Sequence, residues 1–175
     1  MNVYNLLNKI GNYSPIILFM CSVYTLYSKT NYLYYYVLGY ILDSCVNKIL
    51  QNIFKTPTPL EDEKKINLLI KKNNNIILKN NEILNEKFGM PSKNVESIMY
   101  SLTYIYLSTE KIYYLVFYSS ILLYVIWIDI YFNYHNILQI IVGIIIGLII
   151  AILSYKISKN NLFYLKIKED DNANL

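Results

Sequence analysis

The apolar segment from residue 137 to residue 157 most limits what this chain can fold into. Its 21 residues carry one charged side chain, Lys156, near the end. A helix of that length crosses a hydrocarbon core of about 30 Å. Because a chain in lipid must satisfy its own backbone hydrogen bonds, we expect this segment to be helical. It therefore predicts an integral membrane protein.

Four further apolar segments precede it, at residues 13–28, 31–54, 95–108 and 112–132. The first and third are short, and as helices would reach only about 21–24 Å. They are expected either as short spans or as helices shielded by their neighbours. Residues 2–11 could form an interfacial helix. The predicted fold class is all-α, a polytopic transmembrane helix bundle of about five spans plus that N-terminal interfacial helix.

The chain of 175 residues suits one integral membrane domain, residues 1–175. Only 16% of its residues are charged, against about 25% in ordinary soluble domains. Its basic residues are lysines scattered without a patch, which argues against nucleic-acid binding. Residues 55–93 form a polar inter-helix loop, either amphipathic and lying on the membrane or a solvated insertion. Residues 158–175 are expected to form a polar tail.

Several polar motifs sit at the ends of the apolar segments. Thr56-Pro57-Thr58-Pro59 should end a helix, because proline cannot donate a backbone hydrogen bond. Ser92 is a good N-cap for the third segment. Gly143 and Gly147 have the spacing that allows close helix contact. With five spans, the N-terminus, the 55–93 loop and the turn with the only histidine, His135, all lie on one side of the membrane.

These motifs resemble a known family when they are taken together. Residues 43–59 resemble the first signature of the type 2 phosphatidic acid phosphatase (PAP2) superfamily, closest to its dolichyl diphosphatase branch. Residues 88–94 resemble the second signature, and residues 131–147 the third. The likeness covers roughly residues 31–157. It implies a phosphatase in which one histidine attacks phosphorus, a second protonates the leaving group, and lysine and arginine side chains hold the phosphate oxygens.

Mapped onto this chain, most of that machinery is replaced. His135 keeps the nucleophile position, and Gln139 stands where an acidic partner is common. The lysine position is taken by Gln51, the arginine positions by Thr58 and Asp129, and the second histidine position by Asn94. Asparagine cannot act as a general acid, and losing one costs about 10²–10⁴-fold in rate.

The resemblance implies two sets of candidate site residues. The catalytic candidates are His135, Gln139 and Asn94, and the phosphate-binding candidates are Lys55, Ser92, Lys93, Gln51 and Thr58. No metal and no cofactor are expected. The implied partners are membrane lipids, including a lipid phosphate or polyprenyl diphosphate, in a membrane such as the endoplasmic reticulum or one derived from it.

Three functional hypotheses remain open. The first is a lipid phosphatase with full or weak activity. The second is a catalytically impaired or inactive relative that serves as a structural or lipid-binding membrane protein. The third is a plain helical membrane protein, since a lone histidine at a helix start is more often an interfacial polar residue. Two acidic residues, Asp43 and Asp129, lie within or near apolar segments, where an unpaired charge costs about 2.5–3.5 kcal/mol or more. We expect Asp129 to reach water, and Lys48 could pair with Asp43.

Overall fold

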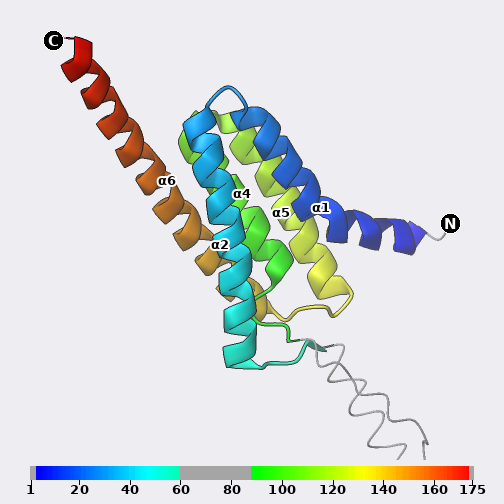
Figure 1. Ribbon diagram of the computed structural model, residues 1–175. Coiled ribbons are helices and arrows are strands. Elements are labelled where there is room, and N and C mark those ends of the chain that lie inside the picture. Colours follow the sequence, from blue (N-terminus) through cyan, green and yellow to red (C-terminus); the bar gives the residue numbers. More distant parts are fainter. Residues whose placement is uncertain (1–2, 60–87, 174–175) are drawn as a thin grey trace, which may run out of the picture.

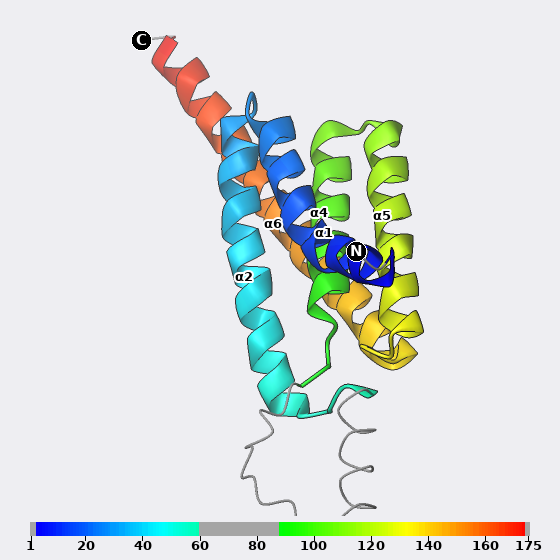
Figure 2. The ribbon, with the colours of Figure 1, turned by 90° about the vertical axis from the view of Figure 1, so that its right-hand side faces the viewer.

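The chain folds into a bundle of five α-helices in the computed structural model, which describes residues 3–59 and 88–173 (Figure 1). This confirms the all-α prediction. The helices are α1 (Val3–Leu26), α2 (Thr30–Phe54), α4 (Lys93–Thr109), α5 (Ile112–Tyr131) and α6 (Ile137–Ala173). Each helix runs opposite in direction to the one before it, and α4 lies among the other four (Figure 2).

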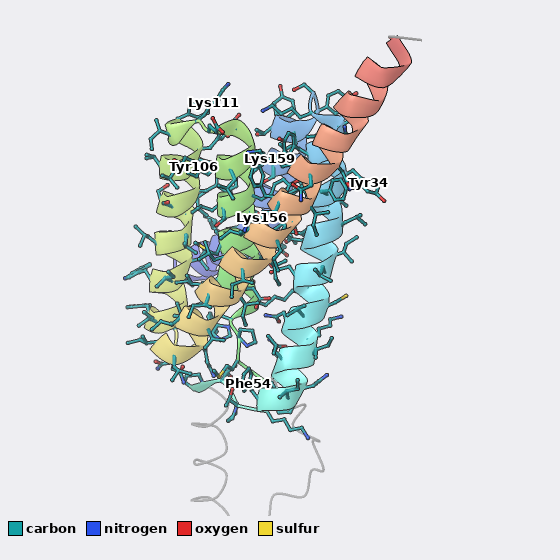
Figure 3. All side chains as sticks on the ribbon, turned by 90° about the vertical axis from the view of Figure 1, so that its left-hand side faces the viewer. Tyr34, Phe54, Tyr106, Lys111, Lys156 and Lys159 are labelled. Carbon is teal, nitrogen blue, oxygen red and sulfur yellow. The ribbon has the colours of Figure 1, made fainter. Side chains whose placement is uncertain are left out.

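Side-chain burial separates the central helix from the outer ones. Most of the α4 side chains are buried, including Val95, Ile98 and Tyr104. The outer helices instead expose large apolar side chains, such as Trp127 of α5 and Ile145 of α6. Figure 3 shows side chains of this kind projecting outward from the bundle. An apolar exterior around a partly polar interior suits a bundle surrounded by lipid.

Two helices are long and apolar enough to cross a membrane by length and composition. They are α5, over its whole length, and residues Ile137–Leu162 of α6. The five predicted helical segments are therefore all present among the described residues, while two of them qualify as spans on these grounds. The amphipathic character expected for residues 60–87 lies outside the described residues.

Two helices differ in length from the expected segments. Helix α1 begins at Val3, so the short helix expected at residues 2–11 is continuous with the first apolar segment. Its N-terminal part turns away from the rest of the bundle in Figure 1, and the helix contains an internal proline, Pro15, which removes a backbone donor. Helix α6 runs on to Ala173, through most of the segment expected as a polar tail.

The glycine spacing in α6 brings it close to α4, as predicted. A Cβ atom added at Gly143 would lie 2.9 Å from the carbonyl oxygen of Ser92. One added at Gly147 would overlap the carbonyl oxygen of Glu96. The missing side chains thus let the two backbones touch, and α6 holds the start of α4 in place.

The connections at one end of the bundle meet, in agreement with the predicted topology. The Gly89 amide donates to the Thr56 carbonyl at 2.8 Å, and Pro57 and Phe88 form an antiparallel bridge. The Ser92 amide donates to the carbonyl of Gln139, at the start of α6, at 3.1 Å. The ends of the 55–93 segment therefore lie against the turn that carries the histidine. Lys111 lies at the opposite end of the bundle from Phe54 (Figure 3).

Candidate functional site

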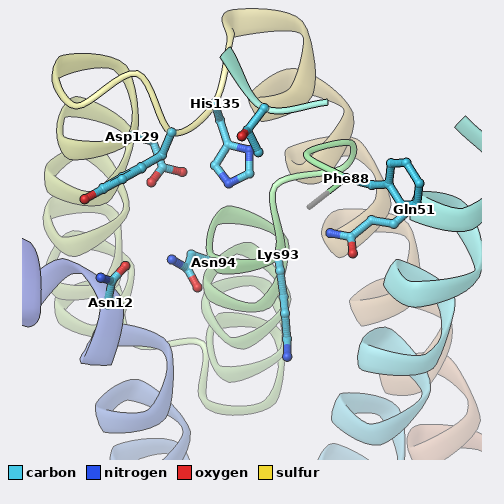
Figure 4. A pocket seen from close by; sticks show the side chains of 9 residues that line it. Asn12, Gln51, Phe88, Lys93, Asn94, Asp129 and His135 are labelled. Carbon is cyan, nitrogen blue, oxygen red and sulfur yellow. The ribbon is translucent and has the colours of Figure 1, made fainter. Parts of the chain in front are cut away.

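A cavity of about 610 Å³ opens at this end of the bundle. Figure 4 shows side chains from α1, α2, α4, α5 and the two connections around it. Its lining residues are Asn12, Gln51, Thr58, Phe88, Lys93, Asn94, Asp129, Tyr134 and His135. Four segments that are far apart in the sequence thus supply the polar groups of one site.

His135 is oriented by Gln139, one turn further along the chain. The Nδ1 atom of His135 lies 3.3 Å from Oε1 of Gln139. Gln139 is buried, and its Nε2 donates to the carbonyl of Pro57 at 3.1 Å. A side chain held at both ends of its amide cannot rotate freely. Gln139 therefore fixes the imidazole ring from behind the cavity wall.

Gln139 also helps to begin α6. Its backbone amide donates to Oδ1 of Asn136 at 2.9 Å, and the amide of Asn136 donates to its Oε1 at 3.1 Å. This reciprocal pair satisfies two donors that a helix start otherwise leaves free. Helix capping alone is thus a sufficient structural reason for a glutamine here, independent of any catalytic role.

The start of α4 forms a second wall of the cavity. Ser92 is the N-cap, as predicted, but its hydroxyl donates to Oδ2 of Asp129 at 3.0 Å and not to the α4 backbone. Asn94 lies near His135, whereas the Lys93 side chain extends along α4 away from it (Figure 4). The helix N-terminus adds a partial positive charge on this side.

Asp129 does not reach out to water, so that expectation was wrong. Its side chain is only 2% exposed, and it lies near enough to His135 for an electrostatic interaction. Its backbone carbonyl accepts hydrogen bonds from the amides of Tyr134 and His135, at 2.9 and 3.3 Å. The turn between α5 and α6 therefore folds back on Asp129, which keeps a carboxyl group beside the histidine.

The structure gathers most of the predicted site residues, with one exception. Gln51, Thr58, Lys93, Asn94 and His135 line the cavity, and Ser92 and Gln139 stand behind its wall. Lys55 lies outside the lining. It is the exposed C-cap of α2, where it adopts a left-handed backbone with φ of 47°.

Three lining residues were not predicted, namely Asn12, Phe88 and Tyr134. Phe88 and Tyr134 lie inside the second and third signatures, so their place in those motifs was an available signal. Asn12 comes from the N-terminal helix. No motif marks it, because its place in the cavity depends on how α1 packs against α5.

The polar groups of the cavity can hold an anion but are poorly equipped to transform one. Lys93 and the α4 N-terminus supply positive charge, and Gln51, Thr58 and Asn94 supply hydrogen-bond donors. Asp129 supplies a carboxyl group that would repel an anion when ionised. The full sequence contains no arginine, so no lining residue can bind a phosphate through the two parallel N–H groups of a guanidinium.

Removing the charge of Asp129 should strengthen anion binding. In an Asp129→Asn variant, we expect inorganic phosphate to bind about ten-fold more tightly, because a nearby like charge is lost. The asparagine retains an acceptor for the Ser92 hydroxyl. Isothermal titration of the detergent-solubilised protein measures the affinity. Glu110→Gln makes the same kind of change at an exposed residue at the far end of α4 and should have no effect. Equal affinities in all three proteins would contradict the expected repulsion.

Comparison with known proteins gives one result. The family model described as PAP2 superfamily matches residues 32–163, which is most of the chain and includes every residue that lines the cavity except Asn12. No curated protein and no solved structure matches.

Proposed function

The chain belongs to the PAP2 superfamily, and from this premise we propose that it is a catalytically impaired member that binds lipid phosphates. Within the family, we propose the dolichyl diphosphatase branch, because the motifs of this chain resemble that branch's signatures. Its ligand would be a phosphatidic acid or a polyprenyl diphosphate, with the headgroup in the cavity and the chains in the surrounding lipid.

The buried carboxyl group of Asp129 is the observation that carries this proposal. It occupies a position at which the resemblance calls for an arginine, and it contacts Ser92 at the wall of the cavity. Phosphoryl transfer depends on cations that stabilise negative charge as it develops on the oxygens. An anion at that place raises the barrier for a bound phosphate.

Asn94 supports the same proposal. It lies at the position of the histidine that would protonate the leaving group, and it lines the cavity. An amide can hydrogen-bond to that oxygen but cannot transfer a proton to it. The leaving group would then depart as an unprotonated, poorly stabilised anion.

The proposed membrane placement goes beyond the two helices that are long and apolar enough to span a membrane. We propose that all five helices cross the bilayer, with the short ones covered by their neighbours, as befits the central position of α4. The cavity would then open at one membrane surface, at the level of lipid headgroups. The endoplasmic reticulum, or a membrane derived from it, is the proposed compartment.

An active phosphatase is the second candidate function. It is favoured by the contact of His135 with Gln139, because this contact holds the imidazole ring in one orientation at the edge of the cavity. A fixed imidazole is the first requirement for nucleophilic attack. Lys93 would have to swing toward it to supply the missing positive charge.

Phosphate release separates these two functions. Purified protein in detergent is given phosphatidic acid or a polyprenyl diphosphate, beside a His135→Ala variant. For the impaired protein, we expect both to release phosphate at the same background rate, because the site lacks a general acid and bidentate cations. Binding of the same lipids, measured without turnover, should persist. If wild type released phosphate well above the His135→Ala variant, the active phosphatase would be the correct description.

A further inference from the structure

Two buried carboxyl groups face each other between α2 and α4, away from the cavity. Asp43 of α2 and Glu96 of α4 are both fully buried. Their side chains lie within hydrogen-bonding reach of each other. Glu96 follows Lys93 by one helical turn, so the pair lies just beneath the start of α4. Neither residue belongs to the cavity lining.

Each carboxyl group receives one hydrogen bond from a neutral donor. The hydroxyl of Ser97 donates to Oδ2 of Asp43 at 3.2 Å, and Nδ2 of Asn47 donates to Oε2 of Glu96 at 2.6 Å. The other two oxygens, Oδ1 of Asp43 and Oε1 of Glu96, have no donor among the described residues. Lys48, which was expected to pair with Asp43, is exposed instead.

Ionising both carboxyl groups at this buried position would be energetically unfavourable. Each loses its hydration on burial, and each repels the other at short range. A single proton resolves both problems, because it neutralises one group and turns the repulsion into a hydrogen bond. It also supplies the donor that the two unpaired oxygens lack.

The charged groups around the pair do not offer another way to stabilise two ionised carboxylates. Lys93 acts electrostatically on Asp43, but it is exposed, so water screens it. Tyr40 of α2 and Tyr100 of α4 are the other titratable groups near Asp43 among the described residues. Helix α6 contributes Gly147, which packs against the Glu96 backbone and carries no charge.

We propose that Asp43 and Glu96 form a proton-binding site in which one shared proton joins α2 to α4. Hydrogen bonds to Pro91, the residue before the α4 N-cap, connect this site to the cavity. The carbonyl of Pro91 accepts hydrogen bonds from Asn47 at 3.4 Å and from Gln51 at 3.2 Å. Loss of the proton would push α2 and α4 apart at this point. The proposal holds whether or not the cavity is catalytic.

Infrared spectroscopy of the full-length protein in detergent detects the proton directly. Asp129 is the other buried acidic residue among those described, so the measurement uses an Asp129→Asn background. At neutral pH we expect the carbonyl band that only a protonated carboxyl group gives. The band should vanish when Asp43→Asn and Glu96→Gln are added, and remain with Glu110→Gln, an exposed control. Absence of the band in the Asp129→Asn protein overturns the proposal without any change to the pair.

Thermal unfolding at different pH values gives a second readout. The folded protein holds a proton that the unfolded chain releases at neutral pH, so raising the pH favours unfolding. The unfolding temperature of the wild type should therefore fall between neutral and alkaline pH, and fall less in the Asp43→Asn/Glu96→Gln variant. Identical pH dependence in the two proteins overturns the proposal. So does a rise in unfolding temperature on adding Na⁺ or Mg²⁺ in the wild type alone, which would assign the site to a metal cation.

Discussion

Phosphate release from phosphatidic acid is expected to rise by at least about 10²-fold when Asn94→His and Asp129→Arg are combined in one protein. The first change returns a group that can protonate the leaving oxygen. The second replaces a repelling carboxyl group by a cation that binds phosphate through two N–H groups. Both positions line the same cavity as His135, so the new groups would lie in the same site.

The gain must depend on His135 if the cavity is the site of reaction. Adding His135→Ala to the double variant should return phosphate release to the background. The single variants are informative as well, because Asn94→His leaves the repulsion of Asp129 in place and should gain much less than the pair. If the folded double variant bound phosphatidic acid and yet released no more phosphate than the wild type, the assignment of these two positions would be wrong.

The helices were predictable because each is an apolar stretch with clear ends. Lys29 and Lys111 mark two boundaries, and the proline-rich segment marks a third. Their lengths were less predictable. In the sequence, α4 is a short and weakly apolar segment, because it contains several serines and tyrosines. In the structure these side chains form hydrogen bonds with neighbouring helices. Ser101, for example, contacts the hydroxyl of Tyr36 at 2.9 Å.

The site was predictable to the extent that its residues follow chain motifs. His135, Asn94 and Thr58 were found because each lies at a fixed place in a recognisable pattern. Lys55 was misleading, because a residue inside a motif can cap a helix end with its side chain exposed and outside the cavity lining. The partners of Asp129 and Asp43 could not be predicted, because Ser92, Ser97 and Glu96 reach them only through the packing of separate helices.

Gly147→Ala is expected to destabilise the bundle by about 1–3 kcal/mol or more. The added methyl group would overlap the carbonyl oxygen of Glu96 and lie 3.1 Å from the amide nitrogen of Tyr100. Both are backbone atoms of α4 and cannot rotate aside, so the two helices must separate. The midpoint of thermal unfolding in detergent measures the loss.

Gly11→Ala is the matched control for this substitution. There the new methyl group would meet Cδ1 of Ile128 at 2.8 Å, which is the flexible end of a side chain. Both variants make the same chemical change within a helix, and alanine is the better helix former. A large loss at residue 147 with little change at residue 11 would therefore measure the close contact of α4 with α6. Equal unfolding midpoints would mean that α4 and α6 do not rely on this contact. The start of α4, with Ser92 and Asn94, would then need another support to stay beside His135.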